Sequence, residues 1–139
     1  MKLRVETEIR LTESRERVEA AVKNIFPTLN LQLWGQKLVG ESTEIEALSK
    51  LHQLLRQQAI LDTARSTMLA NRKGNTTEFM LNKQVAFVGK VSFTDGESPL
   101  GPIIVHLEAP DIERLIDYLA PRTHEGKPIQ ELSSEEVQG

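Results

Sequence analysis

The chain opens with a regular alternation of apolar and polar side chains. Leu3 and Val5 begin a period-two apolar series, and polar residues, most of them charged, occupy the positions between. Because successive side chains of a strand point to opposite faces, this pattern predicts a strand over residues 3–11 that is buried on one face. Shorter apolar runs that end at glycine predict two more strands, at residues 29–33 and 38–39.

Apolar residues at helical spacing predict four helices. Ser14 is placed to cap the first, and Thr43 with Glu46 has the spacing of a capping box for the second. The apolar stripe changes phase near Gln58, which predicts a break before the third helix. Pro110 suits the first turn of the fourth. The helices are expected at residues 15–26, 44–57, 60–73 and 110–120.

The second half of the chain contains three more predicted strands. Runs rich in β-branched and aromatic residues predict strands at residues 76–81 and 87–93, with a tight connection over residues 82–86 between them. Closely spaced glycine, proline and aspartate predict an ordered loop over residues 94–102. The last strand is then expected at residues 103–107.

The length and the distribution of apolar residues indicate one domain. A chain of 139 residues has the commonest size of a single domain, and no second hydrophobic cluster is visible along it. The end of the chain lacks apolar periodicity and is acidic and rich in serine. We therefore expect one α+β domain over residues 1–132, followed by a disordered acidic tail over residues 133–139.

The composition narrows the classes of function. The absence of cysteine excludes disulfides, thiolate zinc sites and cysteine nucleophiles, and it is typical of a cytosolic protein. No apolar run is long enough to span a bilayer, and the glutamates in the first strand do not fit a signal peptide. Aromatic residues make up only 4% of the chain, which leaves few platforms for stacking nucleic-acid bases. We expect a cytoplasmic protein without a membrane segment.

No recognisable catalytic or cofactor-binding motif is present in the sequence. The three histidines are far apart, and none has a partner at metal-ligand spacing. Neither a phosphate-binding glycine loop nor a nucleophile elbow occurs. Asp111 and Glu113 are explained by the favourable interaction of acids with the start of a helix. We predict a binding protein without metal or cofactor, and a hydrolase whose site is assembled only by folding is the alternative.

Positive charge is concentrated in the middle of the chain. Residues 50–92 hold seven basic and two acidic residues, a net charge of +5, whereas the whole chain has a net charge of −3. Such asymmetry indicates a polyanion-binding surface, with ordinary solvated charges as the alternative. Within this region Asn82, Lys83 and Gln84 offer a cation and two amides, which suit phosphates, riboses and base edges. A polar turn is the alternative for these three residues.

Three segments of the chain, residues 60–65, 79–93 and 98–103, resemble a family of uncharacterised archaeal proteins. The middle segment, FMLNKQVAFVGKVSF, is the longest and most specific. Members of this family are described as predicted RNA-binding proteins and, in some cases, as predicted exosome subunits. The resemblance implies a fold similar to that of the ribosomal protein that binds five-S RNA, with helices packed on one face of a mostly antiparallel sheet.

The resemblance and the basic region together predict a non-catalytic RNA-binding protein. The resemblance also implies an association with RNA processing or degradation. Asp62 and Arg65 can equally form an i,i+3 ion pair. The alternative is a protein-interaction or assembly module whose sheet edge or helix surface docks a protein. The expected partners are RNA and a protein complex of RNA processing, and the oligomeric state is open. The expected nucleic-acid-binding residues are Arg56, Arg65, Arg72, Lys73, Asn82, Lys83, Gln84 and Lys90.

Overall fold

Helices and strands are mixed along the whole of the described chain, which comprises residues 1–97 and 99–137 of a computed structural model. In chain order the elements are β1 (Lys2–Glu8), α1 (Arg15–Ile25), β2 (Gln32–Trp34), β3 (Lys37–Ser42), the 3-10 turn η1 (Ile45–Leu48), α2 (Ser49–Gln57), α3 (Leu61–Ala70), β4 (Thr76–Asn82), α4 (Lys83–Phe87), β5 (Pro102–Glu108), α5 (Ile112–Leu119), β6 (Thr123–His124), β7 (Lys127–Pro128) and α6 (Ser134–Val137).

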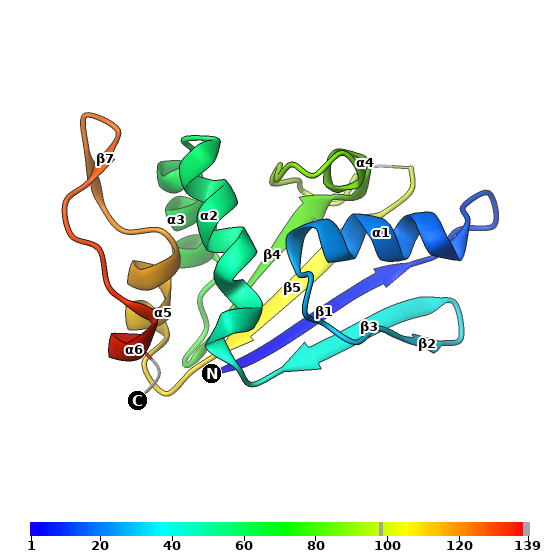
Figure 1. Ribbon diagram of the computed structural model, residues 1–139, viewed down its shortest axis with the longest axis horizontal. Helices are drawn as coiled ribbons and strands as arrows, with labels where there is room; N and C mark the ends of the chain where they lie inside the picture. The colour runs from blue at the N-terminus through cyan, green and yellow to red at the C-terminus, as the bar shows by residue number, and fades with distance from the viewer. Residues whose placement is uncertain (98, 138–139) are drawn as a thin grey trace.

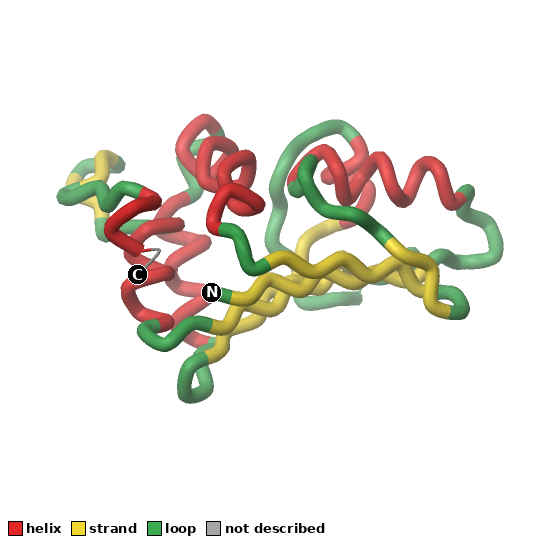
Figure 2. The backbone as a smooth tube through the Cα atoms, turned by 60° about the horizontal axis from the view of Figure 1, so that its bottom comes forward, coloured by secondary structure: helices red, strands yellow, loops and turns green. Residues whose placement is uncertain are grey.

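Five strands form one antiparallel sheet in the order β2-β3-β1-β5-β4 (Figure 1). In its centre, Val5 of β1 lies opposite Gly40 of β3 on one side and Val105 of β5 on the other. Figure 2 shows the described helices on one side of the sheet or beyond its end, and the opposite face without a helix. The predicted α+β class, with helices on one face of an antiparallel sheet, is confirmed. The closer likeness to a ribosomal protein stays a prediction.

The hydrophobic core lies between the sheet and the helices. Alternate residues of β1, β4 and β5 are buried, which confirms the period-two pattern for Leu3, Val5 and Thr7. The strand is shorter than the predicted residues 3–11, because β1 ends at Glu8 and Leu11 is exposed. Val18 and Ile25 lie on the buried stripe of α1, and the Ser14 hydroxyl caps this helix by accepting a hydrogen bond from the Arg17 amide at 3.1 Å. Burial of these apolar side chains is the main stabilising contribution to the fold.

The strand predicted over residues 87–93 and the tight connection predicted over residues 82–86 are both wrong. Asn82 ends β4 and caps α4 by accepting a hydrogen bond from the Val85 amide at 2.9 Å. The Gln58 side chain holds the segment after α4, because its amide both donates to the Val91 carbonyl and accepts from the Val91 amide. Tertiary contacts therefore override the β propensity of this segment.

The start of the second helix also differs from the prediction. Thr43 and Glu46 do not form a capping box, since the chain first enters η1, whose N-cap Glu44 makes no capping bond through its side chain. The predicted break near Gln58 is confirmed. The helix α2 ends at Gln57, and Ala59 has a φ of 55°, a left-handed conformation that interrupts a helix.

Residues 121–137, here called the C-terminal strap, run along the outer side of α3 and α5 (Figure 1). The strap contains the hairpin of β6 and β7, and α6 packs on α5. A helical turn at Ser134–Val137 thus lies within the tail that we expected to be disordered. Residues 138–139 of that tail, and Ser98 of the predicted loop, lie outside the described residues.

Candidate nucleic-acid interface

The eight residues predicted to bind nucleic acid lie at three separate places in the fold. Two arginines face the C-terminal strap, two residues lie at the turn between α3 and β4, and four surround α4. The seven-residue strand β4 separates the second group from the third by roughly 20 Å, since a strand rises about 3.3 Å per residue. These residues therefore do not form one patch. The groups are Arg56 and Arg65, then Arg72 and Lys73, then Asn82, Lys83, Gln84 and Lys90.

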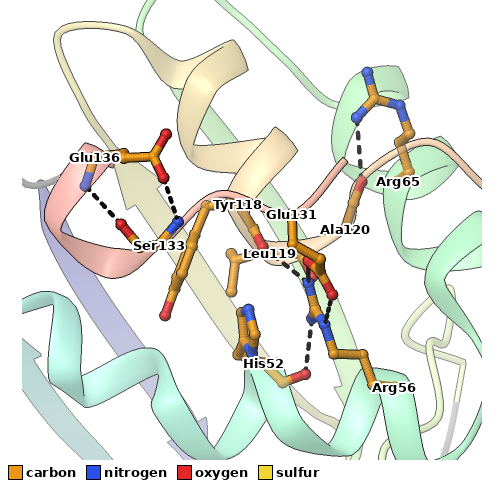
Figure 3. A network of polar contacts seen from close by, with 9 residues as sticks. All are labelled: His52, Arg56, Arg65, Tyr118, Leu119, Ala120, Glu131, Ser133 and Glu136. Carbon is orange, nitrogen blue, oxygen red and sulfur yellow. Dashed lines mark hydrogen bonds and ion pairs between the residues drawn. The ribbon is translucent and has the colours of Figure 1, made fainter. Parts of the chain in front are cut away.

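Arg56 is engaged in internal contacts (Figure 3). Its guanidinium binds both carboxylate oxygens of Glu131, with Nε at 2.8 Å from Oε2. It also donates to the carbonyls of His52, Leu119 and Tyr118 at 2.9, 3.0 and 3.2 Å. The side chain is 20% exposed. Arg56 thus joins α2, the end of α5 and the C-terminal strap, and it has little capacity left for a ligand.

Arg65 and Asp62 contact residues outside α3 and do not pair with each other. The Arg65 guanidinium donates to Asp117 at 2.7 Å and to the Ala120 carbonyl at 3.1 Å. The Asp62 carboxylate accepts a hydrogen bond from the Thr123 hydroxyl at 2.6 Å. The i,i+3 pair that the sequence allowed is therefore replaced by contacts to the end of α5 and to the strap.

His52 lies beside the Arg56 contacts, with its ring stacked on Tyr118 at a centroid distance of 4.6 Å (Figure 3). Its Nε2 atom is buried and has no hydrogen-bond partner among the residues that the structure describes. Burial lowers the pKa of His52, the neighbouring Arg56 guanidinium lowers it further, and the Glu131 carboxylate partly opposes both. The neutral imidazole is therefore the form that the fold favours.

This lowered pKa predicts a pH-dependent stability. As the pH falls below about 6.5, the unfolded chain takes up a proton that folded His52 resists, so the free energy of unfolding should decrease until the folded pKa is passed. The variant His52→Phe keeps the ring stack and should lack this decrease. Urea titrations between pH 7 and pH 5 measure it, and equal slopes for both proteins would contradict the assignment.

Lys83 is directed into the protein and not toward solvent. Its side chain is 4% exposed, and Nζ donates to the Glu8 carbonyl at 2.6 Å, the Leu100 carbonyl at 2.7 Å and the Glu13 carboxylate at 3.0 Å. Asn82 is used as the cap of α4, whereas Gln84 is exposed. The polar run at the start of α4 is thus mainly structural, and Gln84 is its solvent-facing member.

A cleft of about 440 Å³, here called the α1–α4 cleft, opens between these two helices. Apolar side chains from both helices and the aliphatic stem of Lys83 form much of its lining, and polar residues complete it. The Arg17 guanidinium lies over the Phe87 ring at 4.4 Å from its centroid, a distance suited to a cation–π interaction. Asn24 joins the two helices by donating to the carbonyls of Ala86 and Phe87 at 3.0 and 3.1 Å.

Three exposed cations lie around these two helices, and in the described part of the chain none of them forms an ion pair. They are Arg17 and Lys23 of α1, and Lys90 just after α4. The Lys90 amide bonds back to the Val85 carbonyl, while Asn24, next to Lys23, reaches the end of α4. Sequence reasoning missed Arg17 and Lys23, because the glutamates of α1 offset its basic residues and keep the net charge of this segment low.

The turn between α3 and β4 borders a second, shallower depression of about 590 Å³. Lys73 is exposed there, whereas Arg72 pairs with Glu113. Lys2 and Arg4 also line this depression, but Arg4 forms ion pairs with carboxylates of β1 and β3 on the uncovered sheet face.

Carboxylates outnumber cations on the uncovered face of the sheet. The outward positions of β1, β3, β4 and β5 carry five glutamates and three basic residues, together with His106, which lies 3.0 Å from Glu78. A face with this charge repels a polyanion. The glutamates are Glu6, Glu8, Glu41, Glu78 and Glu108, and the basic residues are Lys2, Arg4 and Lys37.

Among residues 1–97 and 99–137, no group of three or more histidine, aspartate or glutamate side chains is arranged to hold a metal ion. In the same part of the chain, no helix has the length and apolar character that crossing a bilayer requires.

The fold and the cleft define a class of protein: a small α+β domain with one uncovered sheet face and a cleft between two helices that Arg17 and Phe87 both line. Residues 2–109 match the model of a family that is described as RNA binding. A UPF0201 protein of Sulfurisphaera tokodaii is 44% identical over 136 residues, which cover 94% of each chain. A UPF0201 protein of Methanopyrus kandleri is 43% identical, and the match covers 87% of this chain and 85% of the relative.

Solved structures that resemble this fold come from the same family as these relatives. The crystal structure of a UPF0201 protein from Methanococcus jannaschii has a TM-score of 0.85 at 33% identity, and the match covers 94% of this chain and 100% of that one. The crystal structure of an uncharacterized UPF0201 protein has a TM-score of 0.81 at 36% identity. The chain therefore belongs to the UPF0201 family, whose relatives compared above come from archaea.

Proposed function

We propose that this protein binds RNA through the surface around the α1–α4 cleft and catalyses no reaction on it. The observation that carries the proposal is a set of three exposed cations that have no carboxylate partner within the described chain: Arg17 and Lys23 of α1, and Lys90 just after α4, the helix that carries exposed Gln84. Cations free of internal ion pairs can neutralise phosphates, and an amide can contact riboses or base edges.

Two further observations are consistent with RNA binding at this surface. All four residues fall within residues 2–109, the range that matches a family described as RNA binding. The uncovered sheet face has an excess of carboxylates, and four of the predicted basic residues, Arg56, Arg65, Arg72 and Lys83, already bind carboxylates of the chain. The helical side therefore offers the more favourable electrostatic environment for a polyanion.

Charge reversal at two of these cations tests the proposal. The double variant Lys23→Glu/Lys90→Glu should weaken binding of a structured RNA roughly tenfold or more at low salt, and it should reduce the slope of log affinity against log salt by about two. Fluorescence anisotropy with a labelled RNA hairpin over a range of salt concentrations measures both quantities. A circular dichroism spectrum shows whether the variant is folded.

Two matched variants make the result specific. Lys37→Glu/Lys127→Glu reverses two exposed lysines elsewhere and should change affinity less than about threefold, since only long-range attraction is lost. Lys2→Glu/Lys73→Glu reverses charge at the far depression. If this variant weakens binding more than the α1–α4 variant, the location is wrong. If the unmodified protein retards no RNA at low salt, RNA binding itself is wrong.

A role in RNA processing or degradation, a cytoplasmic location and a partner protein complex are finer proposals, which the family resemblance supports. They predict that tagged protein co-purifies with nucleases or other RNA-processing proteins. Treatment with ribonuclease separates partners that are held by shared RNA from partners that dock directly. Purification of the protein without such partners would contradict this finer proposal and would leave RNA binding standing.

A further inference from the structure

We propose that the α1–α4 cleft receives a single unpaired nucleotide of the RNA, whose base stacks on the Phe87 ring. This inference rests on the proposed RNA binding and adds the kind of RNA: one with a bulged, looped or terminal base, and not a continuous duplex. On this inference, the cleft makes the protein prefer RNAs with an unpaired base, whereas the surrounding cations bind any RNA.

The cleft has the composition of a site for a nucleobase. Val18 and Ala21 of α1 and Leu100 of the loop between α4 and β5 give it apolar walls, while Ser14 and Gln84 place a hydroxyl and an amide among the lining residues. The Glu13 carboxylate also lines the cleft, and Lys83 pairs with it. Its volume of about 440 Å³ falls within the range of roughly 300–1,000 Å³ that small-ligand sites occupy. Apolar walls with a few polar groups bind a flat heterocycle and orient its edge.

Phe87 is an aromatic residue that is both exposed and part of the cleft lining. Its side chain is 39% exposed, although phenylalanine is usually buried. Arg17 covers the ring from one side, which holds the ring in place and sets a guanidinium next to any base that stacks there. Aromatic and guanidinium planes are the groups on which unstacked RNA bases rest.

The small number of exposed aromatic side chains limits the site to one nucleotide. Trp34 is also an exposed aromatic, but it lies on the edge strand β2 beside Arg4, which is paired with Glu6 and Glu41. The α1–α4 cleft combines an exposed ring with Arg17, which forms no ion pair with any residue that the structure describes. A single stacking position beside phosphate contacts suits a base that is flipped out of a helix, and a long single strand would need several such positions.

The test uses one RNA hairpin in two forms, fully paired and with a single bulged 2-aminopurine. The protein should bind the bulged form about tenfold more tightly, the order expected for stacking of one base, and the emission of the 2-aminopurine should change on binding. Free 2-aminopurine riboside monophosphate is the third probe, because a cleft that served a mononucleotide would bind it as tightly as the bulged RNA, which would overturn the proposal.

Variants assign the preference to Phe87. Phe87→Leu keeps an apolar side chain of similar size but has no ring, and it should reduce the preference for the bulged form to less than about twofold while binding of the paired hairpin is kept. Phe87→Trp should retain the preference. Trp34→Leu removes the other exposed ring and should have no effect, so loss of the preference in this variant alone would place the base on the sheet and overturn the assignment.

The outcomes separate this inference from the proposed function. Equal affinity of the unmodified protein for the bulged and paired hairpins, with unchanged emission, would overturn the nucleotide site and leave RNA binding intact. Failure to bind either hairpin would overturn both. A preference that survives Phe87→Leu would overturn the role of the ring.

Discussion

Replacing Lys83 by methionine should reduce the free energy of unfolding by about 3 kcal/mol, because it removes the ammonium that pairs with the Glu13 carboxylate and donates to two carbonyls, and leaves Glu13 with the Arg10 amide as its donor. Methionine preserves most of the apolar stem, so the loss reports the ammonium contacts and not a cavity. The melting temperature should fall by roughly 10 °C for a domain of this size. Urea unfolding followed by circular dichroism measures the change.

Two further variants identify the cause of this loss. The double variant Lys83→Met/Glu13→Gln should be more stable than Lys83→Met alone, since it removes the charge that the single variant leaves buried and unpaired. Lys127→Met removes an exposed lysine and should change the free energy of unfolding by less than about 0.5 kcal/mol. If Lys83→Met also lay within 1 kcal/mol of the unmodified protein, the internal role of Lys83 would be wrong.

The role of Lys83 also shows where sequence reasoning reaches its limit. Its place in a polar, basic stretch favoured an exposed phosphate contact, but its acceptors lie 75, 70 and 17 positions away in the chain. Arg56 is similar, because Glu131 is 75 positions away. A local charge count cannot distinguish a cation that the fold neutralises from one that remains free, since pairing depends on tertiary structure.

Elements that depend on local patterns were predicted well. The alternation of β1, the stripe of α1 with its Ser14 cap and the break near Gln58 each follow from side-chain periodicity or backbone chemistry within a few residues. The helix α4 was missed because the polar run at residues 82–84 is typical of a turn and Phe87 favours a strand, while the Asn82 cap and the hydrogen bonds of Gln58 fix a different backbone course. The candidate site between α1 and α4 needed this packing to become visible.

Replacing Arg56 by lysine should lower the free energy of unfolding by about 2 kcal/mol, although the positive charge is kept. A guanidinium presents several donors in a fixed plane, whereas an ammonium cannot reach the Glu131 carboxylate and the three carbonyls together. The hydrogen bonds from Arg56 also hold the pKa of Glu131 below its ordinary range, so this contribution is present at neutral pH and is lost as Glu131 protonates in acid.

The same variant should loosen the C-terminal strap before the domain unfolds, because Glu131 anchors the strap to α2 through Arg56. Trypsin reports this opening at Arg122, an exposed residue at the start of the strap, and cleavage there should be several-fold faster in Arg56→Lys. Arg114→Lys is the matched control, since Arg114 contacts the strap at Glu136 through one exposed hydrogen bond to the carbonyl at 3.1 Å and an exposed ion pair at 4.0 Å. Equal cleavage rates for all three proteins would mean that hydrophobic packing and not Arg56 holds the strap in place.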